Sequence, residues 1–159
     1  MLLNDDVVLT PSFLGCLLEG IPSDERIGMA CGKLLASDGR TIDSTGQFLS
    51  RARTASERGF RSIDEGQFDE PSFVFSVPGA AALYRRRMLE TLAVGHQYFD
   101  ERMGMYLEDL ELGWRAQRGG WRAYYVPGAV ACHARGATAK SRRPRWSWLR
   151  RYYLPWLPP

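Results

Sequence analysis

Apolar residues in the first half of the chain come in short runs separated by turn residues, a pattern typical of β-strands. Met1–Leu3 is an apolar run that continues into Asn4-Asp5-Asp6, and Ile27–Ala36 is a longer run followed by Asp38-Gly39. The Asp-Gly pair predicts a hairpin turn, after which Arg40–Leu49 should return beside Ile27–Ala36. We expect Met1–Leu3 to be the end of a buried strand in the interior of a parallel sheet.

Two helices and two further strands follow from similar signals. Thr10-Pro11 combines a capping residue with a proline at the first helical position and predicts a helix to about Glu19. Phe73–Val77 and Ala80–Tyr84 are short apolar runs on either side of a Pro-Gly break, and we expect both to be strands. Arg86–Val94 should form a short helix.

A stretch of alternating acidic and apolar residues begins near Tyr106. Its large apolar residues recur at helical spacing and share one face: Leu107, Leu110 and Trp114. Glu108 and Asp109 then lie in the first turn, where the helix dipole favours ionised carboxylates. Gly119-Gly120 supplies the C-terminal stop. Acidic residues at a helix start are often only favourable decoration, so this pair carries no function by itself.

Four other segments complete the predicted order of elements. Ser50–Glu70 is polar, aperiodic and rich in both charges, and we expect a long mobile loop. Gly95–Met105 should also be a loop. Trp121–Val126 and Ala129–His133 read as two strands around a Pro-Gly turn.

Length and composition place the chain among ordinary globular proteins. It has 159 residues, 45% hydrophobic and 25% charged, which suits a single domain. Its longest apolar runs fall short of a membrane span, and the acidic residues near Met1 do not resemble a secretion signal. The three cysteines are odd in number and form no C-x-x-C pair. We therefore expect a cytoplasmic protein without a disulfide framework or a thiolate zinc site.

The charge distribution is strongly asymmetric. All 18 acidic residues lie at or before Glu111, whereas 10 of the 21 lysines and arginines follow it. Residues 140–159 form a tail in which basic residues alternate with Trp and Tyr, and residues 140–153 could contact an anionic membrane surface. A solvated, frayed tail is an equally good interpretation. Nucleic acid is a less favoured partner, because no nucleic-acid-binding fold precedes the tail.

Oxygen and imidazole donors appear at both ends of the predicted domain. Asn4-Asp5-Asp6 follows an apolar strand, and ligands of open α/β sheets bind at the carboxyl ends of strands. His133 ends another apolar strand and precedes Arg135 and Thr138, which could hold a diphosphate. Such donors suit Mg²⁺ or Mn²⁺. Each piece has a simpler alternative, since Asn-Asp-Asp is common in turns and a lone histidine is often structural.

Taken together, these segments resemble the C-terminal half of a family-2 glycosyltransferase of the rhamnosyltransferase-like kind, with the GT-A nucleotide-sugar fold. The resemblance covers Leu3 to about Thr138. Its matching segments, in order, are LLNDDVVLTPSFL, GKLLASDGRTIDSTG, VPGAAALYRR, FDERMGMYLEDLELGWRAQRGGWRAYYVP and AVACHARGAT. The resemblance implies an α/β fold with a GT-A-like mixed sheet and flanking helices. It divides the chain into a partial catalytic domain at 1–139 and a basic-aromatic tail at 140–159.

The resemblance also implies roles for single residues. Asn4-x-Asp6 matches the family's Asp-x-Asp-type element, in which Asp6 would hold the divalent cation, Mg²⁺ or Mn²⁺, and Asn4 would contact the donor. His133 matches a late histidine that also reaches the metal. Asp109 matches the general base that deprotonates the acceptor, and Glu108 would help to place that acceptor.

Four further residues would complete the substrate site. Gly79 and Ala80 match a turn that lets the substrate approach the backbone closely. Arg135 and Thr138, which follow His133, are the expected substrate-binding residues for the donor's diphosphate. We expect Asp6 and His133 to meet in the fold and to share one cation.

The implied activity is the inverting transfer of a sugar from a nucleotide-diphosphate donor, with dTDP-rhamnose as the candidate, to a glycan or lipid-linked acceptor. The setting would be cell-envelope polysaccharide synthesis in the cytoplasm or at the inner face of the plasma membrane. The family's N-terminal half, which holds the nucleoside, would precede Met1. We therefore expect impaired transfer by this chain alone. The alternatives are a non-catalytic remnant and a peripheral membrane-binding module.

Overall fold

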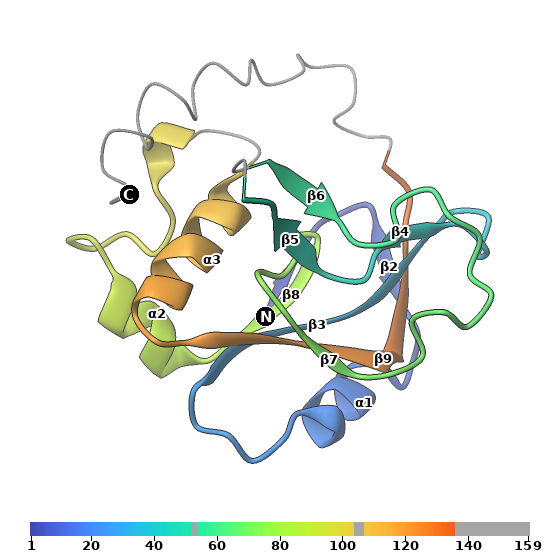
Figure 1. The fold of residues 1–159 in the computed structure, drawn as a ribbon, viewed down its shortest axis with the longest axis horizontal. Coiled ribbons are helices and arrows are strands. Elements are labelled where there is room, and N and C mark those ends of the chain that lie inside the picture. Colours follow the sequence, from blue (N-terminus) through green and yellow to red (C-terminus); the bar gives the residue numbers. More distant parts are fainter. Residues whose placement is uncertain (52–53, 104–106, 136–159) are drawn as a thin grey trace.

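The computed structural model describes residues 1–51, 54–103 and 107–135 (Figure 1). They form a seven-stranded sheet in the order β1-β8-β3-β9-β2, with β4 paired to β3 and β7 paired to β9. β3 and β9 run parallel, and the other pairs are antiparallel. The strands are β1 Leu2–Leu3, β2 Val7–Leu9, β3 Ile27–Ala36, β4 Ile42–Ser44, β7 Ser72–Val74, β8 Ala81–Tyr84 and β9 Arg122–His133. A separate two-stranded sheet pairs β5 Gln47–Leu49 with β6 Ala55–Glu57.

Helices cover both faces of the large sheet. α1, Phe13–Gly20, packs on one face, whereas α2, Arg86–Leu92, and α3, Glu108–Arg118, pack on the other (Figure 1). A short 3₁₀ helix, η1 Glu101–Met103, precedes α3. The structure confirms the predicted mixed α/β class, with a mixed sheet between helices.

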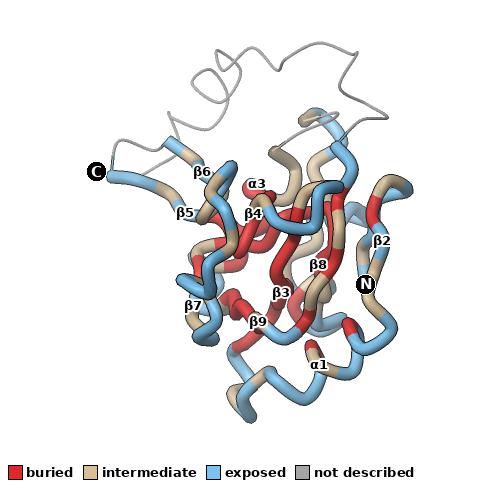
Figure 2. Tube along the Cα trace, turned by 90° about the vertical axis from the view of Figure 1, so that its right-hand side faces the viewer, coloured by how far each residue is buried: buried red, intermediate tan, exposed pale blue. Residues whose placement is uncertain are grey.

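The sheet is buried on both sides because neighbouring residues of its central strands face opposite helices. Tyr124 and Val126 of β9 join the core under α1, while Ala123 and Tyr125 join the core under α2 and α3. The central strand β3 is accordingly buried along nearly its whole length (Figure 2). This explains why β3 appears in the sequence as a nearly unbroken apolar run.

Several sequence predictions are confirmed. β3 spans Ile27–Ala36 as expected, and Gly39 adopts a positive φ of 65° in the turn that leads to β4. α1 begins two residues after the predicted proline start, and Thr10 instead donates a side-chain hydrogen bond to the Val130 carbonyl. α3 ends at Arg118, immediately before Gly119.

The buried face of α3 differs from the predicted one. Leu110 is buried, but Trp114 is only half-buried, and Leu107 lies before the helix with a left-handed φ of 74°. The residues buried within the helix are Leu110, Leu112, Gly113 and Ala116. Left-handed backbone is unusual for a leucine and marks a locally constrained entry into the helix.

The predicted break in the last strand pair is wrong. β9 is one strand from Arg122 to His133, and Pro127-Gly128 lies inside it. The register beside β3 shifts here, since Cys31 pairs with Tyr125 and Lys33 pairs with Val130. The Pro-Gly pair thus forms an irregularity within the strand. Because the regular pairing is interrupted there, the lack of an N–H on proline breaks no ladder hydrogen bond.

The predicted return strand at Arg40–Leu49 is also interrupted. β4 ends at Ser44, and β5 begins at Gln47 as part of the small sheet. Gly46 lies between them with a φ of 114°, a value that favours glycine. The chain therefore changes sheets within two residues.

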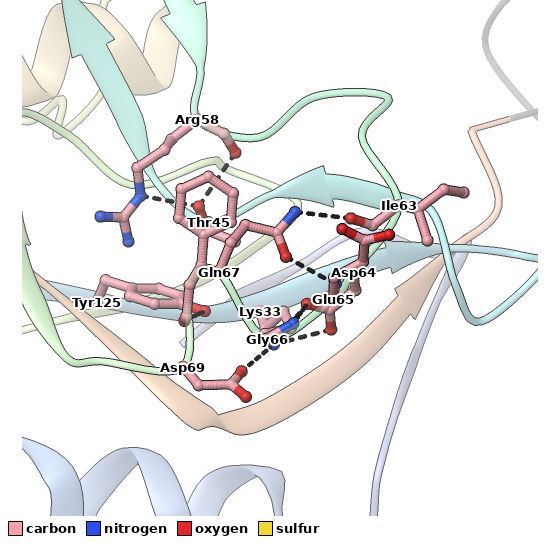
Figure 3. A network of polar contacts seen from close by, with 11 residues as sticks. Lys33, Thr45, Arg58, Ile63, Asp64, Glu65, Gly66, Gln67, Asp69 and Tyr125 are labelled. Carbon is pink, nitrogen blue, oxygen red and sulfur yellow. Dashed lines mark hydrogen bonds and ion pairs between the residues drawn. The ribbon is translucent and has the colours of Figure 1, made fainter.

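The predicted long mobile loop at Ser50–Glu70 contains β6 and is fastened to the large sheet. Lys33 of β3 is 5% exposed, and its Nζ lies 2.8 Å from Asp64 Oδ2 and also bonds Asp69 (Figure 3). Burial alone would lower the pKa of Lys33, but hydrogen bonds to the two aspartates outweigh it and raise that pKa. An ion pair of this kind holds residues 64–69 against β3.

Arg58, in the middle of the same segment, ties it to two other parts of the chain. Its Nε donates to Thr45 Oγ1 at 2.8 Å, and its guanidinium lies over the Tyr125 ring at 4.6 Å from the centroid (Figure 3). These contacts could not be predicted from the polar sequence of the segment, because the residues that it contacts lie far away in the chain.

The prediction for Met1–Leu3 is corrected as well. β1 has two residues, pairs antiparallel with β8, and lies at the end of the described sheet rather than in its interior. Leu3 is 45% exposed, in keeping with an edge position.

Gly32 should be essential for the fold, because an added Cβ would collide with the carbonyl oxygen of Ala129 in β9. We expect Gly32→Ala to lower the free energy of unfolding by about 3 kcal/mol, measured by urea denaturation. Gly15→Ala is the matched control, since Gly15 in α1 has open space around it. That variant should be more stable by about 0.5–1 kcal/mol. Equal urea midpoints for Gly32→Ala and the wild type would contradict the close approach of β3 and β9.

Candidate active site

A pocket of about 410 Å³ opens where several distant segments meet. It contains most of the predicted site residues: Asn4, Gly79, Ala80, Glu108, Asp109, His133 and Arg135. Asp6 is not part of its wall but contacts His133. Thr138 lies outside the described residues, as does the tail at 140–159. The pocket is also lined by polar residues that the sequence analysis did not select, namely Asp43, Gln47 and Glu57.

The Asp109 carboxylate is held by three N–H donors. Oδ1 accepts a hydrogen bond from its neighbour Leu110 N at 2.7 Å. Oδ2 accepts from Gly79 N at 2.8 Å and from Gln47 Nε2 at 2.9 Å. Because a carboxylate has about four lone-pair sites, three donors leave roughly one site for a further partner. Asp109 is thus fixed in orientation while keeping the capacity to accept a proton.

The turn before β8 fits closely around this carboxylate. A Cβ on Gly79 would lie 3.3 Å from Asp109 Cβ and 3.4 Å from Oδ2, which is tighter than ordinary contact. Asn4 N donates to the Ala80 carbonyl at 2.9 Å, and this bond brings the first loop to the same wall. Glu108 lines the pocket beside Asp109. The predicted acid pair and the predicted Gly-Ala turn therefore meet in one place.

Asp6 and His133 form a second group of predicted site residues that the fold brings together. His133 Nε2 lies 3.2 Å from Asp6 Oδ1, and the Ala134 N–H donates to the Asp6 carbonyl at 2.9 Å. The antiparallel pairing of β2 with β9 causes this proximity, since Val7 is opposite His133. Two residues separated by most of the chain are adjacent because their strands are neighbours.

Asp43 supports His133 from behind. It is 3% exposed, its Oδ2 lies 2.8 Å from His133 Nδ1, and its Oδ1 bonds Arg135 Nε. The hydrogen bond to Asp43 raises the pKa of His133, an effect that partial burial opposes. A carboxylate on Nδ1 orients the ring and leaves Nε2 directed toward Asp6, the arrangement typical of histidines that bind metals.

The donors at this end fit a divalent cation that also binds substrate oxygens. Among residues 1–51, 54–103 and 107–135, no group of three His, Cys, Asp or Glu is placed to hold a metal ion. Mg²⁺ commonly takes one or two protein ligands and completes its shell with phosphates and water. Asp6 Oδ1 and His133 Nε2 are close enough to share such an ion, and their role as ligands stays a prediction.

Arg135 forms a cationic rim beside this pair. Its guanidinium lies 4.7 Å from the centroid of the Phe60 ring and bonds Asp43. Its side chain remains 46% exposed, so it can still reach an anion in the pocket. Phe60 belongs to the segment Ser50–Glu70, so this segment contacts the site through Arg135.

The sequence signal for the missed residues was weak. Asp43 and Ser44 lay in a predicted return strand, where buried polar side chains call for a partner. Gln47 and Glu57 gave no spacing that related them to Asp109. Their positions follow from the pairing of β5 with β6, in which Gln47 is opposite Glu57.

Comparison with known proteins identifies a family. A family model described as glycosyltransferase-like family 2 matches residues 1–150. A search of curated proteins found no significant match. In the part of the chain that the structure describes, no helix is both long and apolar enough to cross a membrane.

The Asp43–His133 contact predicts a pH dependence. The pKa of His133 is raised above its ordinary value of 6.5 in the folded chain. Protonated His133 therefore stabilises the fold, and this contribution is fully present at pH values below 6.5. That stabilisation is lost as the pH rises through the folded pKa. Asp43→Asn should lower the pKa of His133, measured by NMR titration of the imidazole protons in metal-free protein. The exposed His96 provides an internal control, because its signal should not respond to the substitution. An unchanged His133 titration would contradict the assignment.

Proposed function

The chain belongs to glycosyltransferase-like family 2, and we propose that its pocket transfers a sugar from a nucleotide-diphosphate donor to an acceptor hydroxyl with inversion. The main support is that the tightly held carboxylate of Asp109 and the imidazole of His133 line one pocket. A base and a diphosphate site are the two requirements of this displacement. The residues around Asp109 and His133 indicate where the acceptor, the metal and the donor would bind.

Asp109 acts as the general base in this proposal. The acceptor oxygen attacks the anomeric carbon, its proton passes to Asp109, and the bond from that carbon to the diphosphate oxygen breaks. The three N–H donors around Asp109 hold its carboxylate in one orientation. Glu108 positions the acceptor beside it.

The other end of the pocket takes the donor. Asp6 and His133 would hold a Mg²⁺ or Mn²⁺ ion, whose chemistry there would be to neutralise charge on the departing diphosphate. Arg135 binds the same phosphates as a charged hydrogen-bond donor. Asn4 and the Gly79-Ala80 turn contact the sugar, because they line the same pocket as Asp109 and His133.

The resemblance to rhamnosyltransferase-like enzymes supports dTDP-rhamnose as the first donor to test. A glycan or lipid-linked acceptor follows from the same resemblance and would place the enzyme in cell-envelope polysaccharide synthesis. The basic-aromatic tail suits work in the cytoplasm at the inner face of the plasma membrane. The GT-A-like fold is likewise part of this proposal, supported by the mixed sheet and the positions of the site residues.

Asp109→Asn tests the proposed base. It keeps the shape of the side chain and removes its basicity, so turnover should fall by about a hundredfold or more. The assay is release of nucleoside diphosphate from dTDP-rhamnose, UDP-glucose and GDP-mannose, with water as the acceptor. Donor affinity, measured by calorimetry, should persist. Near-normal turnover by Asp109→Asn would refute the role. Binding without turnover in the wild type would instead favour a non-catalytic function.

Mn²⁺ binding tests the proposed cation site without relying on activity. We expect Asp6→Ala to weaken Mn²⁺ binding at least tenfold in the presence of dTDP, measured by electron paramagnetic resonance. Asp5→Ala is the matched control, since Asp5 is the exposed residue next to Asp6 in the chain. Equal losses in both variants would indicate a general effect of surface charge, and the assignment would fail.

A further inference from the structure

Gln47 connects the predicted base to a second carboxylate. Its Nε2 lies 2.9 Å from Asp109 Oδ2 and 3.0 Å from Glu57 Oε1, and the residue is 6% exposed. Carboxylate oxygens accept hydrogen bonds from an amide, so both contacts require the nitrogen to face them. We propose that Gln47 is a positioning residue for Asp109 and that Glu57 holds Gln47 in place. This inference rests on the function proposed above.

The backbone of Gln47 is fixed from both sides. Its N–H donates to the Ser76 carbonyl at 2.9 Å, and its carbonyl accepts from Phe75 N at 3.0 Å. Ser76 Oγ in turn donates to the Asp109 carbonyl at 3.1 Å. The segment Phe75–Ser76 therefore touches both Gln47 and the start of α3. Main-chain and side-chain bonds together leave the amide little freedom to turn away.

Glu57 is anchored on its own side. Gln47 and Glu57 are opposite each other in the β5–β6 pair, where directly opposed side chains share a face. Glu57 Oε2 accepts a short hydrogen bond from Ser44 Oγ, and Ser44 is fully buried. Burial raises the pKa of Glu57, while the bonds from Ser44 and Gln47 oppose that rise. The result is a continuous chain of hydrogen bonds from Ser44 through Glu57 and Gln47 to Asp109.

This chain of hydrogen bonds affects catalysis through the orientation of Asp109. A base must hold its free lone pair toward the acceptor proton, and a displacement of about 1 Å can cost as much as a hundredfold in rate. The hydrogen bonds from Gly79 and Leu110 to Asp109 come from backbone N–H groups, so no side-chain substitution removes them. Gln47 is thus the side-chain donor through which the orientation of Asp109 can be tested.

Gln47→Met removes the amide and keeps a similar length. We expect turnover in the nucleoside diphosphate release assay to fall at least about tenfold with little change in donor affinity. In the Asp109→Asn background the same substitution should cost nothing further, because its effect passes through that carboxylate. Equal losses in both backgrounds, or wild-type turnover by Gln47→Met, would overturn the proposal.

The control is a partly buried side-chain amide in the same helix as Asp109. Gln117 donates from Nε2 to the Phe75 carbonyl at 2.7 Å and does not line the pocket. Gln117→Met should lose thermal stability yet keep its turnover. A comparable fall in turnover by Gln117→Met would mean that loss of any such hydrogen bond is sufficient, and would overturn the proposal.

Two substitutions at Glu57 separate charge from contact. Glu57→Gln retains an oxygen acceptor for the Gln47 amide, whereas Glu57→Met removes it. We expect Glu57→Met to lose several-fold more turnover than Glu57→Gln. The reverse order would contradict the idea that Glu57 acts by holding Gln47.

A measurement on the free protein distinguishes failure of this inference from failure of the proposed function. In ¹H–¹⁵N spectra, Asp109→Asn should shift the side-chain amide signals of Gln47 and leave those of Gln117 in place. Unmoved Gln47 signals would overturn the positioning contact. A clear shift in a protein that releases no nucleoside diphosphate from any donor would leave the contact standing and refute the glycosyltransferase reaction.

Discussion

Buried polar side chains must find hydrogen-bond partners, and this requirement shapes the site. The segment from Asp43 to Gln47 is largely enclosed, yet it carries several polar side chains. Asp43 bonds His133, and Gln47 bonds Asp109, while Ser44 and Thr45 bond Glu57 and Arg58. A single short stretch therefore connects the two ends of the pocket. Because each bond is made away from bulk water, loss of one partner leaves the other unsatisfied and costly.

The change of sheet at Gly46 makes this arrangement feasible. β4 belongs to the large sheet and directs Asp43 toward the end of β9, whereas β5 belongs to the small sheet and directs Gln47 toward α3. Gly46 has a φ of 114° and lies at the point where the chain leaves the large sheet. Asp43 and Gln47, on either side of this turn, both line the pocket although they belong to strands of different sheets.

The charged segment after β6 is held against the large sheet and contacts one residue of the pocket, Arg135. Lys33 lies within an otherwise apolar strand and draws Asp64 and Asp69 onto the sheet. Phe60, held within this segment, then lies under the Arg135 guanidinium. A buried ion pair of this kind is weak evidence for extra stability. Its effect here is geometric, since it determines where an otherwise polar and irregular segment lies.

The sequence alone determined the elements whose pattern is local. The apolar run of β3, its Asp-Gly turn, and the first turn and glycine stop of α3 could all be predicted because hydrophobic period and turn chemistry depend on neighbouring residues. The family resemblance also selected residues that the fold gathers around one pocket. Only the tertiary structure decided that β9 continues through Pro127, that β1 lies at an edge, and that Gln47 reaches Asp109. These features depend on strand register and on which strands become neighbours, and the free energy that determines them comes from contacts between residues far apart in the chain.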